Sequence, residues 1–414
     1  MLEKMKSAWR IPELRKKIIY TFGMLLLYRL LCCIPVPGVN IAAVSEAVKS
    51  FSVLDFMNMM TGGSFQNMTI MAMGITPYIN ASIILQLLTV AIPTLEKLAK
   101  EGPEGRKKIT EWTRYLTVVL AFIQAVGLVF AMRANSYGGI WYVVIGVSMA
   151  AGTALAMWVG ERITENGIGN GISLLIMAGI VSNMFNWSRQ AVVGLIDGTV
   201  GIIAVLVVVL AFLVMIVAIT YVDMGERRIP VQYAKRMVGR KMYGGQSTHI
   251  PMKLNSTGVM PLIFGFAILQ FPATVFAFFP TSGINLWWQG FQSGVWYQVV
   301  LAVLIIAFTY FYTGITFNPA DISKNMQQNG GIIPGIRQGR ATTDYLARVS
   351  SRLTLFSALF LAVLATIPTI ITRLFGVSTP FAASSVLIAV SVGIETIRQI
   401  EAQMVMRHHK GFLG

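Results

Sequence analysis

The chain has 414 residues, of which 55% are hydrophobic and only 12% are charged, and its mean hydropathy is +0.67. Soluble globular proteins carry about 25% charged residues, so this composition excludes an ordinary soluble enzyme and indicates a membrane protein. With only two cysteines, the chain is also not a secreted fold held together by disulfides. The formal net charge is +16, from 33 Lys and Arg residues against 17 Asp and Glu residues.

The chain contains ten apolar stretches that are candidates for membrane-spanning helices. A helix needs about 20 mostly apolar residues to cross roughly 30 Å of hydrocarbon. In chain order, the predicted spans are residues 18–34, 70–92, 115–132, 140–159, 172–185, 200–222, 258–279, 299–317, 353–371 and 382–394. The predicted fold class is therefore an all-α membrane protein with ten transmembrane helices.

The positions of the basic residues support this count. If the N-terminus is cytoplasmic, most Lys and Arg residues fall in cytoplasmic segments, as the positive-inside rule requires. The opposite side then holds only Lys49, Arg133, Arg189 and Arg373. A missed or added span would move every later loop to the other side of the membrane. The pattern therefore predicts that both termini are cytoplasmic, together with two large cytoplasmic loops, 223–257 and 318–352.

The ten spans divide into two sets of five. Residues 1–185 form the predicted N-terminal half, residues 200–414 the C-terminal half, and residues 186–199 an external linker. Because each half has an odd number of spans, the halves run in opposite directions, so any structural repeat is an inverted one.

Irregular spans occur at matching positions in the two halves. The fifth span of each half is short, and the second contains glycine and proline, at Gly74 and Pro77 in one half and at Gly258 and Pro272 in the other. Short or broken spans at corresponding positions are typical of a pathway through a membrane protein. Irregular packing without a pathway is the alternative interpretation.

The predicted pathway carries few charged residues. Arg29 is the clear intramembrane case, and either snorkelling toward the membrane surface or a function explains it. The sequence has no nucleotide-binding P-loop, no metal-ligand spacing and no catalytic constellation. The cluster Gly167–Gly171 lacks a preceding strand, so we interpret it as a tight turn that lets the fifth span begin close to its neighbours. These features indicate a passive conduit without enzymatic activity, cofactor or metal, driven from outside.

A short apolar segment lies between the first two spans, at residues 52–67. The residues that repeat at helical spacing are Val53, Leu54, Met57 and Met60, and the pattern ends at Gly62 and Gly63. The helix is too short to span. Buried within the protein as a re-entrant helix, it would be a movable stopper. A helix lying on the bilayer surface explains the pattern equally well.

Several stretches resemble motifs of the SecY family, the central subunits of the Sec protein-conducting channel. They are IPVPGVN (34–40), MAMGITPYINASIILQLL (71–88), EGRKKITEWTRY (104–115), GERITENGIGNGIS (160–173), QSTHIPMKLN (246–255), FNPADI (317–322) and GGIIPGIRQGR (330–340). They occur in family order along the whole chain. The resemblance implies two inverted five-helix halves around a central hourglass pore, a re-entrant plug helix at about residues 53–63, and a side opening to lipid.

On this resemblance, the family's pore ring falls on six isoleucines: Ile75, Ile79, Ile172, Ile176, Ile263 and Ile388. A narrow apolar ring tends to dewet and so resists ion passage, while branched side chains can yield around a threading polypeptide. Without the resemblance, these isoleucines would be ordinary lipid-facing or core positions.

The resemblance also implies a lateral gate between the second span and the seventh and eighth spans, with Asn80, Gln86 and Gln124 as its polar candidates. Relatives commonly have small hydroxyl residues in the middle of the seventh span, whereas residues 261–272 read PLIFGFAILQFP. The sequence therefore does not decide whether the gate contains a polar cluster, and the prediction of a gate does not depend on such a cluster.

The cytoplasmic loops carry the implied partner sites. Arg240 and Lys241 match the basic tip of the sixth-to-seventh loop, and Arg337 matches a key arginine of the eighth-to-ninth loop. In the family these loops receive the SecA ATPase or the ribosome, although such charges can also serve only to set topology. The resemblance further implies SecE and SecG subunits, unfolded preproteins with signal sequences as substrates, and the bacterial plasma (inner) membrane as the surrounding lipid bilayer. An inverted-repeat secondary solute transporter is the alternative function.

Overall fold

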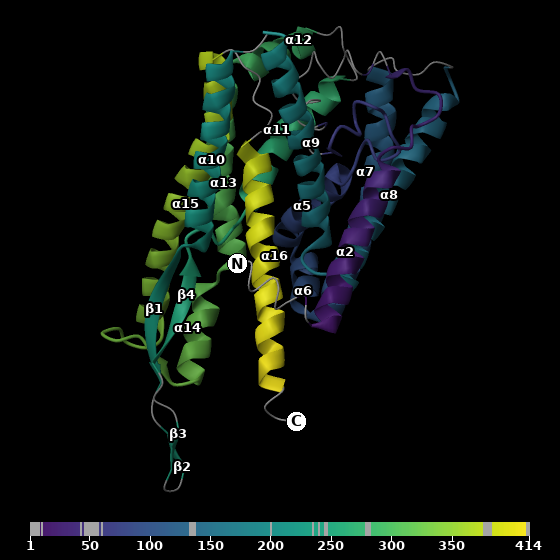
Figure 1. Cartoon of the computed structure of the whole chain (residues 1–414). Coiled ribbons are helices and arrows are strands. Elements are labelled where there is room, and N and C mark those ends of the chain that lie inside the picture. The colour runs from purple at the N-terminus through teal and green to yellow at the C-terminus, as the bar shows by residue number, and fades with distance from the viewer. Residues whose placement is uncertain are drawn as a thin grey trace. The chain divides into compact units, whose positions relative to one another are not determined.

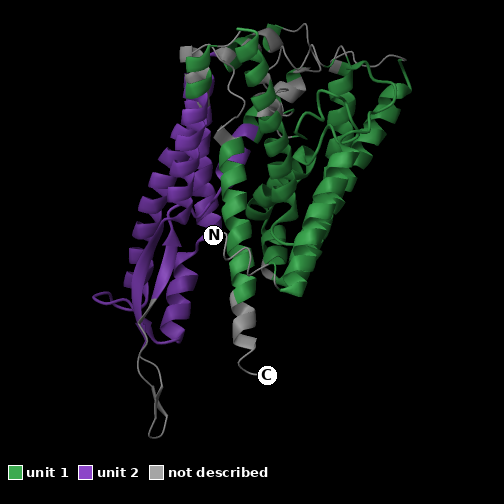
Figure 2. Ribbon diagram, viewed as in Figure 1, with its two compact units in different colours: residues 1–206, 267–293, 377–414 green, residues 207–266, 294–376 purple. Residues whose placement is uncertain are grey.

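The chain folds mainly into helices (Figure 1). The structure, a computed structural model, describes residues 9, 11–41, 44, 58, 61–131, 138–198, 201–233, 236–238, 241–243, 247–277, 283–375 and 383–410. Figure 2 shows its two compact units. Unit 1 comprises Met1–Leu206, Ala267–Ser293 and Val377–Gly414, and unit 2 comprises Val207–Phe266 and Gly294–Gly376.

Unit 1 contains the helices of the first five predicted spans and of the tenth. Its helices are α2 (Pro12–Leu31), α5 (Thr76–Ala91), α6 (Pro93–Lys100), α7 (Pro103–Ala131), α8 (Trp141–Asn166), α9 (Gly171–Ile196), α12 (Gly283–Ser293) and α16 (Ala383–Lys410). Helix α8 packs against α2, α7 and α9, while α5 packs on α7 and α16 packs on α9. This packing brings the second, fifth and tenth predicted spans into one unit.

Unit 2 combines long helices with a small sheet. Its helices are α13 (Val295–Thr316), α14 (Pro319–Gln328), α15 (Arg340–Phe375) and most of α10 (Ile202–Met224). Its strands are β1 (Glu226–Tyr233), β2 (Arg236–Val238), β3 (Lys241–Tyr243), β4 (Ser247–Lys253) and β5 (Gly331–Ile332). Helix α11 (Met260–Ala277) begins in unit 2 and continues into unit 1.

Each of the ten predicted spans overlaps a helix within the ranges that the structure describes. In these ranges, five helical stretches are long and apolar enough to cross a membrane, or six when α5 and α6, which bend by 107°, count as one span. Helix α2 is not among them because it carries charged residues near both ends, from Glu13 to Arg29. The helices agree with an all-α membrane protein, and the individual count of ten stays a prediction.

The second predicted span starts later than its hydropathy indicates. Residues 62–75 form turns, and the helix begins only at Thr76. Gly74 has a φ of +53°, a left-handed conformation that favours glycine. Pro77 lies in the first turn of α5, where backbone N–H groups have no intrahelical acceptor, so the missing N–H of proline costs no hydrogen bond. The helix therefore starts six residues later than the predicted span, because hydropathy reports the polarity of side chains and not the conformation of the backbone.

The predicted linker at residues 186–199 is helical over most of its length, and its role as a link between two halves stays a prediction. Helix α9 continues through Ile196 and ends at Asp197, next to Gly198 with a φ of +68°. Apolar residues such as Val192 and Val193 prolong the helix beyond the predicted short span. Helix α16 likewise continues to Lys410, because Glu395 and Arg398 are compatible with a helix even where they end an apolar stretch.

The two large loops that were predicted to be cytoplasmic, residues 223–257 and 318–352, form one folded module. Strand β1 pairs antiparallel with β4 from Glu226↔Lys253 to Gln232↔Ser247, and its far end pairs with β5 at Tyr233↔Gly331. The strand order is β4-β1-β5, so the sheet joins residues from both loops. Beneath it lies an apolar core formed by Ile229, Val231, Met252, Met326, Ile333 and Leu346. The sheet was not predicted from the sequence, because its strands come from two loops that lie far apart along the chain.

A buried polar network lies at the base of this module. Asn255 is 5% exposed, and its Nδ2 donates to Asp223 Oδ1 over 3.0 Å. Its Oδ1 accepts hydrogen bonds from Ser357 Oγ at 3.1 Å and from Thr257 Oγ1 at 3.3 Å. One side chain thus ties the end of α10 to α15 and to the segment leading into α11. Asn255 closes the QSTHIPMKLN motif, which gives that position a structural role.

Replacing Asn255 with alanine is expected to destabilise unit 2 by about 1–3 kcal/mol, because several buried polar groups lose a partner together. Asn329→Ala is the matched control, since Asn329 is exposed and its Nδ2 donates only to Asn325 O of its own helix end. Thermal unfolding and limited proteolysis of the purified protein measure the effect. Equal unfolding temperatures for the two variants would show that the network contributes nothing to stability.

Candidate functional site

The six predicted pore-ring isoleucines are divided between the units. Five of them lie in unit 1: Ile75 at the N-cap of α5, Ile79 on α5, Ile172 and Ile176 on α9, and Ile388 on α16. Ile263 lies on α11, in the part that belongs to unit 2. Most of the candidate ring therefore lies in unit 1, where α5 with its N-cap and α9 supply four of the six residues.

A tight turn sets the start of α9. Asn170 is the N-cap, and its Oδ1 accepts hydrogen bonds from the backbone N–H groups of Ile172 at 3.1 Å and Ser173 at 3.3 Å. A Cβ placed on Gly171 would lie 1.9 Å from Gly160 O of α8, so only glycine allows this approach. The prediction of a tight turn that brings the fifth span close to its neighbours is confirmed.

Two other helices hold the same turn. The backbone N–H of Ile168 donates to Thr21 Oγ1 of α2 over 3.1 Å, and that of Gly169 donates to Gln399 Oε1 of α16 over 3.0 Å. Ile168 also packs against Leu14 of α2 in a small apolar cluster. The start of α9 is thus fixed to α2, α8 and α16. These contacts position the first two turns of the helix, which carry Ile172 and Ile176.

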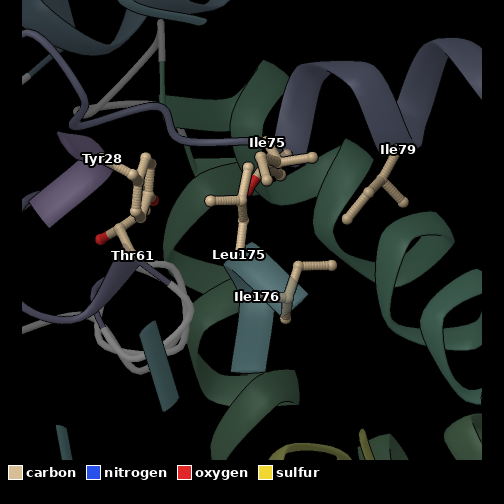
Figure 3. A pocket seen from close by; sticks show the side chains of 7 residues that line it. Tyr28, Thr61, Ile75, Ile79, Leu175 and Ile176 are labelled. Atoms are coloured by element: carbon tan, nitrogen blue, oxygen red, sulfur yellow. The ribbon is translucent and has the colours of Figure 1, made fainter. Parts of the chain in front are cut away.

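Three of the ring isoleucines line one small pocket (Figure 3). Its lining residues are Tyr28, Thr61, Ile75, Thr76, Ile79, Leu175 and Ile176. Ile75 and Ile176 are almost fully buried, at 6% and 7% exposure. None of the lining side chains carries a charge at neutral pH, so the pocket offers no fixed charge to attract an ion.

The remaining ring candidates do not line this pocket. Ile172 packs against α8, where a Cβ placed on Gly160 would lie 3.0 Å from Ile172 Cγ1. Ile388 is buried on α16. In place of Ile172, the pocket takes Leu175 from α9 and adds Tyr28 from α2 and Thr61. These three residues were not predicted from the sequence, because the motifs that carry the resemblance mark positions along the chain and not the direction of each side chain.

The predicted plug is described only at its C-terminal end. Val53, Leu54, Met57 and Met60 lie outside the described residues. Gly62 and Gly63 fall in turns with φ values of +67° and +88°, consistent with the predicted end of a helix. Thr61, within the predicted plug, lines the pocket beside Ile75 and Leu175.

The gate candidates lie on two neighbouring helices. Asn80 and Gln86 are on α5, and Gln124 is on α7, which packs against α5. Asn80 and Gln124 are half-buried, while Gln86 is exposed. The eighth predicted span, on the other side of the gate, is α13 of unit 2. The gate therefore stays a prediction.

The partner-binding candidates lie in unit 2. Arg240 is outside the described residues, and Lys241 begins β3, which pairs with β2 in a short hairpin. Arg337 is exposed on a turn between β5 and α15. Two flanking glycines of that turn, Gly335 and Gly339, have φ values of +82° and +86°.

Hydrogen bonds fix the backbone around Arg337. Thr342 Oγ1 donates to Arg337 O over 2.8 Å, Gln338 Nε2 donates to Gly331 O over 3.2 Å, and Ser323 Oγ donates to Gly339 O over 2.9 Å. A guanidinium on such a turn is held out to solvent by a defined backbone. It can form paired hydrogen bonds with a carboxylate or a phosphate. In the described ranges, no group of His, Cys, Asp or Glu side chains is arranged to hold a metal ion.

The chain matches known proteins over most of its length. The SecY family model matches residues 69–397. The protein translocase subunit SecY of Mycobacterium tuberculosis is 42% identical over an alignment 448 positions long, which covers 100% of both chains. A solved structure of a protein conducting channel aligns with a TM-score of 0.71 and 20% identity, over 94% of this chain and 93% of the other. The channel of a canine ribosome-channel complex from the endoplasmic reticulum aligns with a TM-score of 0.67 and 19% identity, over 94% and 93%. These structures confirm the predicted fold class.

Proposed function

The chain belongs to the SecY family, and on that premise we propose that it is the channel subunit of a protein translocase. It passes unfolded preproteins across the bacterial plasma membrane and releases membrane proteins sideways into the bilayer. The observation that carries the proposal is the convergence of Ile75, Ile79 and Ile176 on one uncharged pocket, beside Thr61 of the predicted plug.

The chemistry of the pocket suits a seal that must also open. A narrow apolar wall disfavours water, and an ion that enters it loses hydration without gaining a ligand. An unfolded polypeptide differs from an ion because it brings its own apolar side chains. A wall of flexible aliphatic groups contacts these without selecting one sequence. We assign Ile172, Ile263 and Ile388 to the same ring on the resemblance.

The wider architecture of the proposal follows the family. The halves 1–185 and 200–414 surround the pore as inverted repeats, and the plug at about residues 53–63 moves aside when a substrate enters. Asn80, Gln86 and Gln124 face the lateral gate. Polar contacts between membrane helices average only about 0.6 kcal/mol, so they break readily when a signal sequence inserts.

The energy for transport comes from partners. We propose that SecA or the ribosome docks on the cytoplasmic module of unit 2, at Arg240, Lys241 and Arg337. One structural relative is described in a ribosome-channel complex, which supports the ribosome as a partner. SecE and SecG complete the proposed assembly. No step requires catalysis by this chain. The curated relative, named a translocase subunit, gives no support to the alternative of a secondary solute transporter.

A stalled preprotein provides the test. A photo-crosslinking amino acid at Ile79 or Ile176 is expected to capture the translocating chain, because both side chains line the pocket. The same probe at Val181 is the control, since Val181 is on α9 but 54% exposed. Capture is measured as a higher-mass product that contains both proteins. Equal labelling at Val181 and Ile176, or none at the ring, would contradict the proposed function.

A further inference from the structure

Arg29 in the first span is bound inside the protein. Its Nη2 donates a hydrogen bond to the backbone carbonyl of Ala178 on α9. Its neighbour Tyr28 is almost fully buried and lines the pocket. Snorkelling would carry the guanidinium toward the membrane surface and would require no protein partner. The observed contact favours a role within unit 1.

The same guanidinium contacts the end of the predicted plug. A Cβ placed on Gly62 would lie 2.7 Å from Arg29 Nη1, 2.8 Å from Nη2 and 2.9 Å from the carbonyl oxygen of Gly179. The Gly62 backbone therefore occupies a slot between Arg29 and α9 that admits no side chain. Gly63 provides a contrast, because a Cβ there would meet nothing within 4 Å.

A second contact ties the same segment to α9. Asn183 Nδ2 donates to Asn58 O over 3.5 Å. Within the segment, the N–H of Gln66 donates to Asn58 Oδ1 over 3.0 Å, and Thr61 Oγ1 donates to Asn58 O over 3.2 Å. Asn58 is thus bonded to both Thr61 and Gln66. Because Gly62 follows Thr61 directly, displacement of Gly62 would also disturb Thr61 in the pocket.

We propose that Arg29 is a latch that holds the described end of the plug segment, Thr61–Gln66, against α9 in the resting channel. Arg29 is a positioning residue, because it acts on the pocket through Gly62 and Thr61 rather than by contacting a substrate. The forked guanidinium suits this role, since Nη2 donates to α9 while Nη1 and Nη2 lie 2.7 Å and 2.8 Å from the position that a Cβ on Gly62 would take. This inference rests on the proposed function, because a latch presupposes a channel with a plug. The contacts of Arg29 are observed in the structure without a substrate.

The test compares glycine and arginine variants in the reconstituted channel with its companion subunits. Thr61→Cys, introduced with Cys32→Ser and Cys33→Ser, reports on the latch through its rate of modification by a water-soluble thiol reagent. Thr61 is 2% exposed, so modification requires the segment to move. Arg29→Met and Gly62→Ala are each expected to raise the rate at least about tenfold, in parallel with the resting chloride leak.

Two further variants distinguish the latch from general backbone strain and from a simple effect of charge. Gly102→Ala, outside the plug segment, imposes similar backbone strain, at a φ of +89° against +67° for Gly62. A Cβ there would meet nothing within 4 Å, so this variant is expected to change neither readout. Arg29→Lys keeps the charge but loses the fork, and is expected to give an intermediate rate. Unchanged rates in Arg29→Met, wild-type behaviour in Arg29→Lys, or equal effects of the two glycine variants would each overturn the proposal.

The result is independent of the test of the proposed function. Both readouts use the resting channel without substrate, and the unfolding temperature of each variant shows that it is folded. A channel that captures a preprotein at Ile176 but shows no change in Arg29→Met refutes only the latch. A channel that fails to capture the preprotein refutes the proposed function, whatever Arg29 does.

Discussion

Replacing Ile75, Ile79 and Ile176 together with glycine is expected to make the resting channel conduct ions, with a rise in conductance of at least about tenfold. The three side chains supply most of the aliphatic volume of the pocket wall, with Leu175 as the fourth aliphatic residue. Their removal would leave space that water can fill, and a continuous file of water lowers the barrier for an ion. Single-channel recordings in planar bilayers, without any substrate, measure the change.

A matched triple variant separates the seal from helix stability. Glycine in a helix interior costs about 1 kcal/mol relative to alanine, which applies to Ile79 and Ile176 but less to Ile75 at the N-cap of α5. Ile84 on α5, Ile123 on α7 and Val181 on α9 are exposed apolar residues whose replacement by glycine carries a similar helix penalty. These changes are expected to leave the conductance at its resting level. Equal conductance in the two triple variants would place the ion barrier outside the pocket.

Reversing the charge of Arg337 is expected to abolish most motor-driven translocation. The side chain is exposed on a turn whose backbone carbonyls accept hydrogen bonds from the side chains of Thr342, Gln338 and Ser323. Arg337→Glu would therefore present a carboxylate where an acidic partner surface or an RNA phosphate is expected. Repulsion between like charges at a docking site costs several kcal/mol, which corresponds to a loss of at least about 90% of activity. Protease protection of a preprotein in vesicles measures translocation.

Arg348→Glu is the control for this prediction. Arg348 is also exposed in unit 2, and its Nε donates only within its own helix, to Asp344 O over 3.3 Å. The two variants change the net charge equally, so a difference between them reports on position. Arg337→Lys is expected to restore part of the activity, because the charge returns without the paired donors. Normal translocation by Arg337→Glu would mean that the loop charges serve only to set topology.

Hydropathy located the helices well because the bilayer imposes a simple requirement. A membrane helix must present apolar side chains over a defined length, and each predicted span overlaps a helix in the described ranges. The ends of the helices could not be predicted in this way. Helix α9 continues to Ile196 and α16 to Lys410, because helices persist beyond the apolar stretch. The start of α5 at Thr76 depends on the backbone at Gly74.

The β4-β1-β5 sheet of unit 2 could not be predicted from the sequence for a different reason. In β1, Ile229 and Val231 alternate with exposed residues, and this is a strand signal. The run is short and lies in a loop interpreted through its charges. Strand β5 joins the sheet from a loop beyond α11 and α13. Local patterns do not reveal pairing between residues so far apart in sequence.

The site was predicted in part. The resemblance selected Ile75, Ile79 and Ile176, which the structure brings to one pocket. It did not select Tyr28, Thr61 or Leu175, because motif matching identifies positions and not neighbours in space. Whether all six isoleucines form one ring stays a prediction, since Ile263 belongs to the other unit.

The anchoring of α9 limits how the channel can widen. Its first turn is bonded to Thr21 of α2 and to Gln399 of α16, and its glycine start is pressed against Gly160 of α8. These four helices therefore form a closely connected group at the start of α9. Helix α5 packs on α7 and has no hydrogen bond to the 168–171 turn in the described residues. We therefore expect that widening during passage of a bulky segment displaces α5 more than it displaces the start of α9.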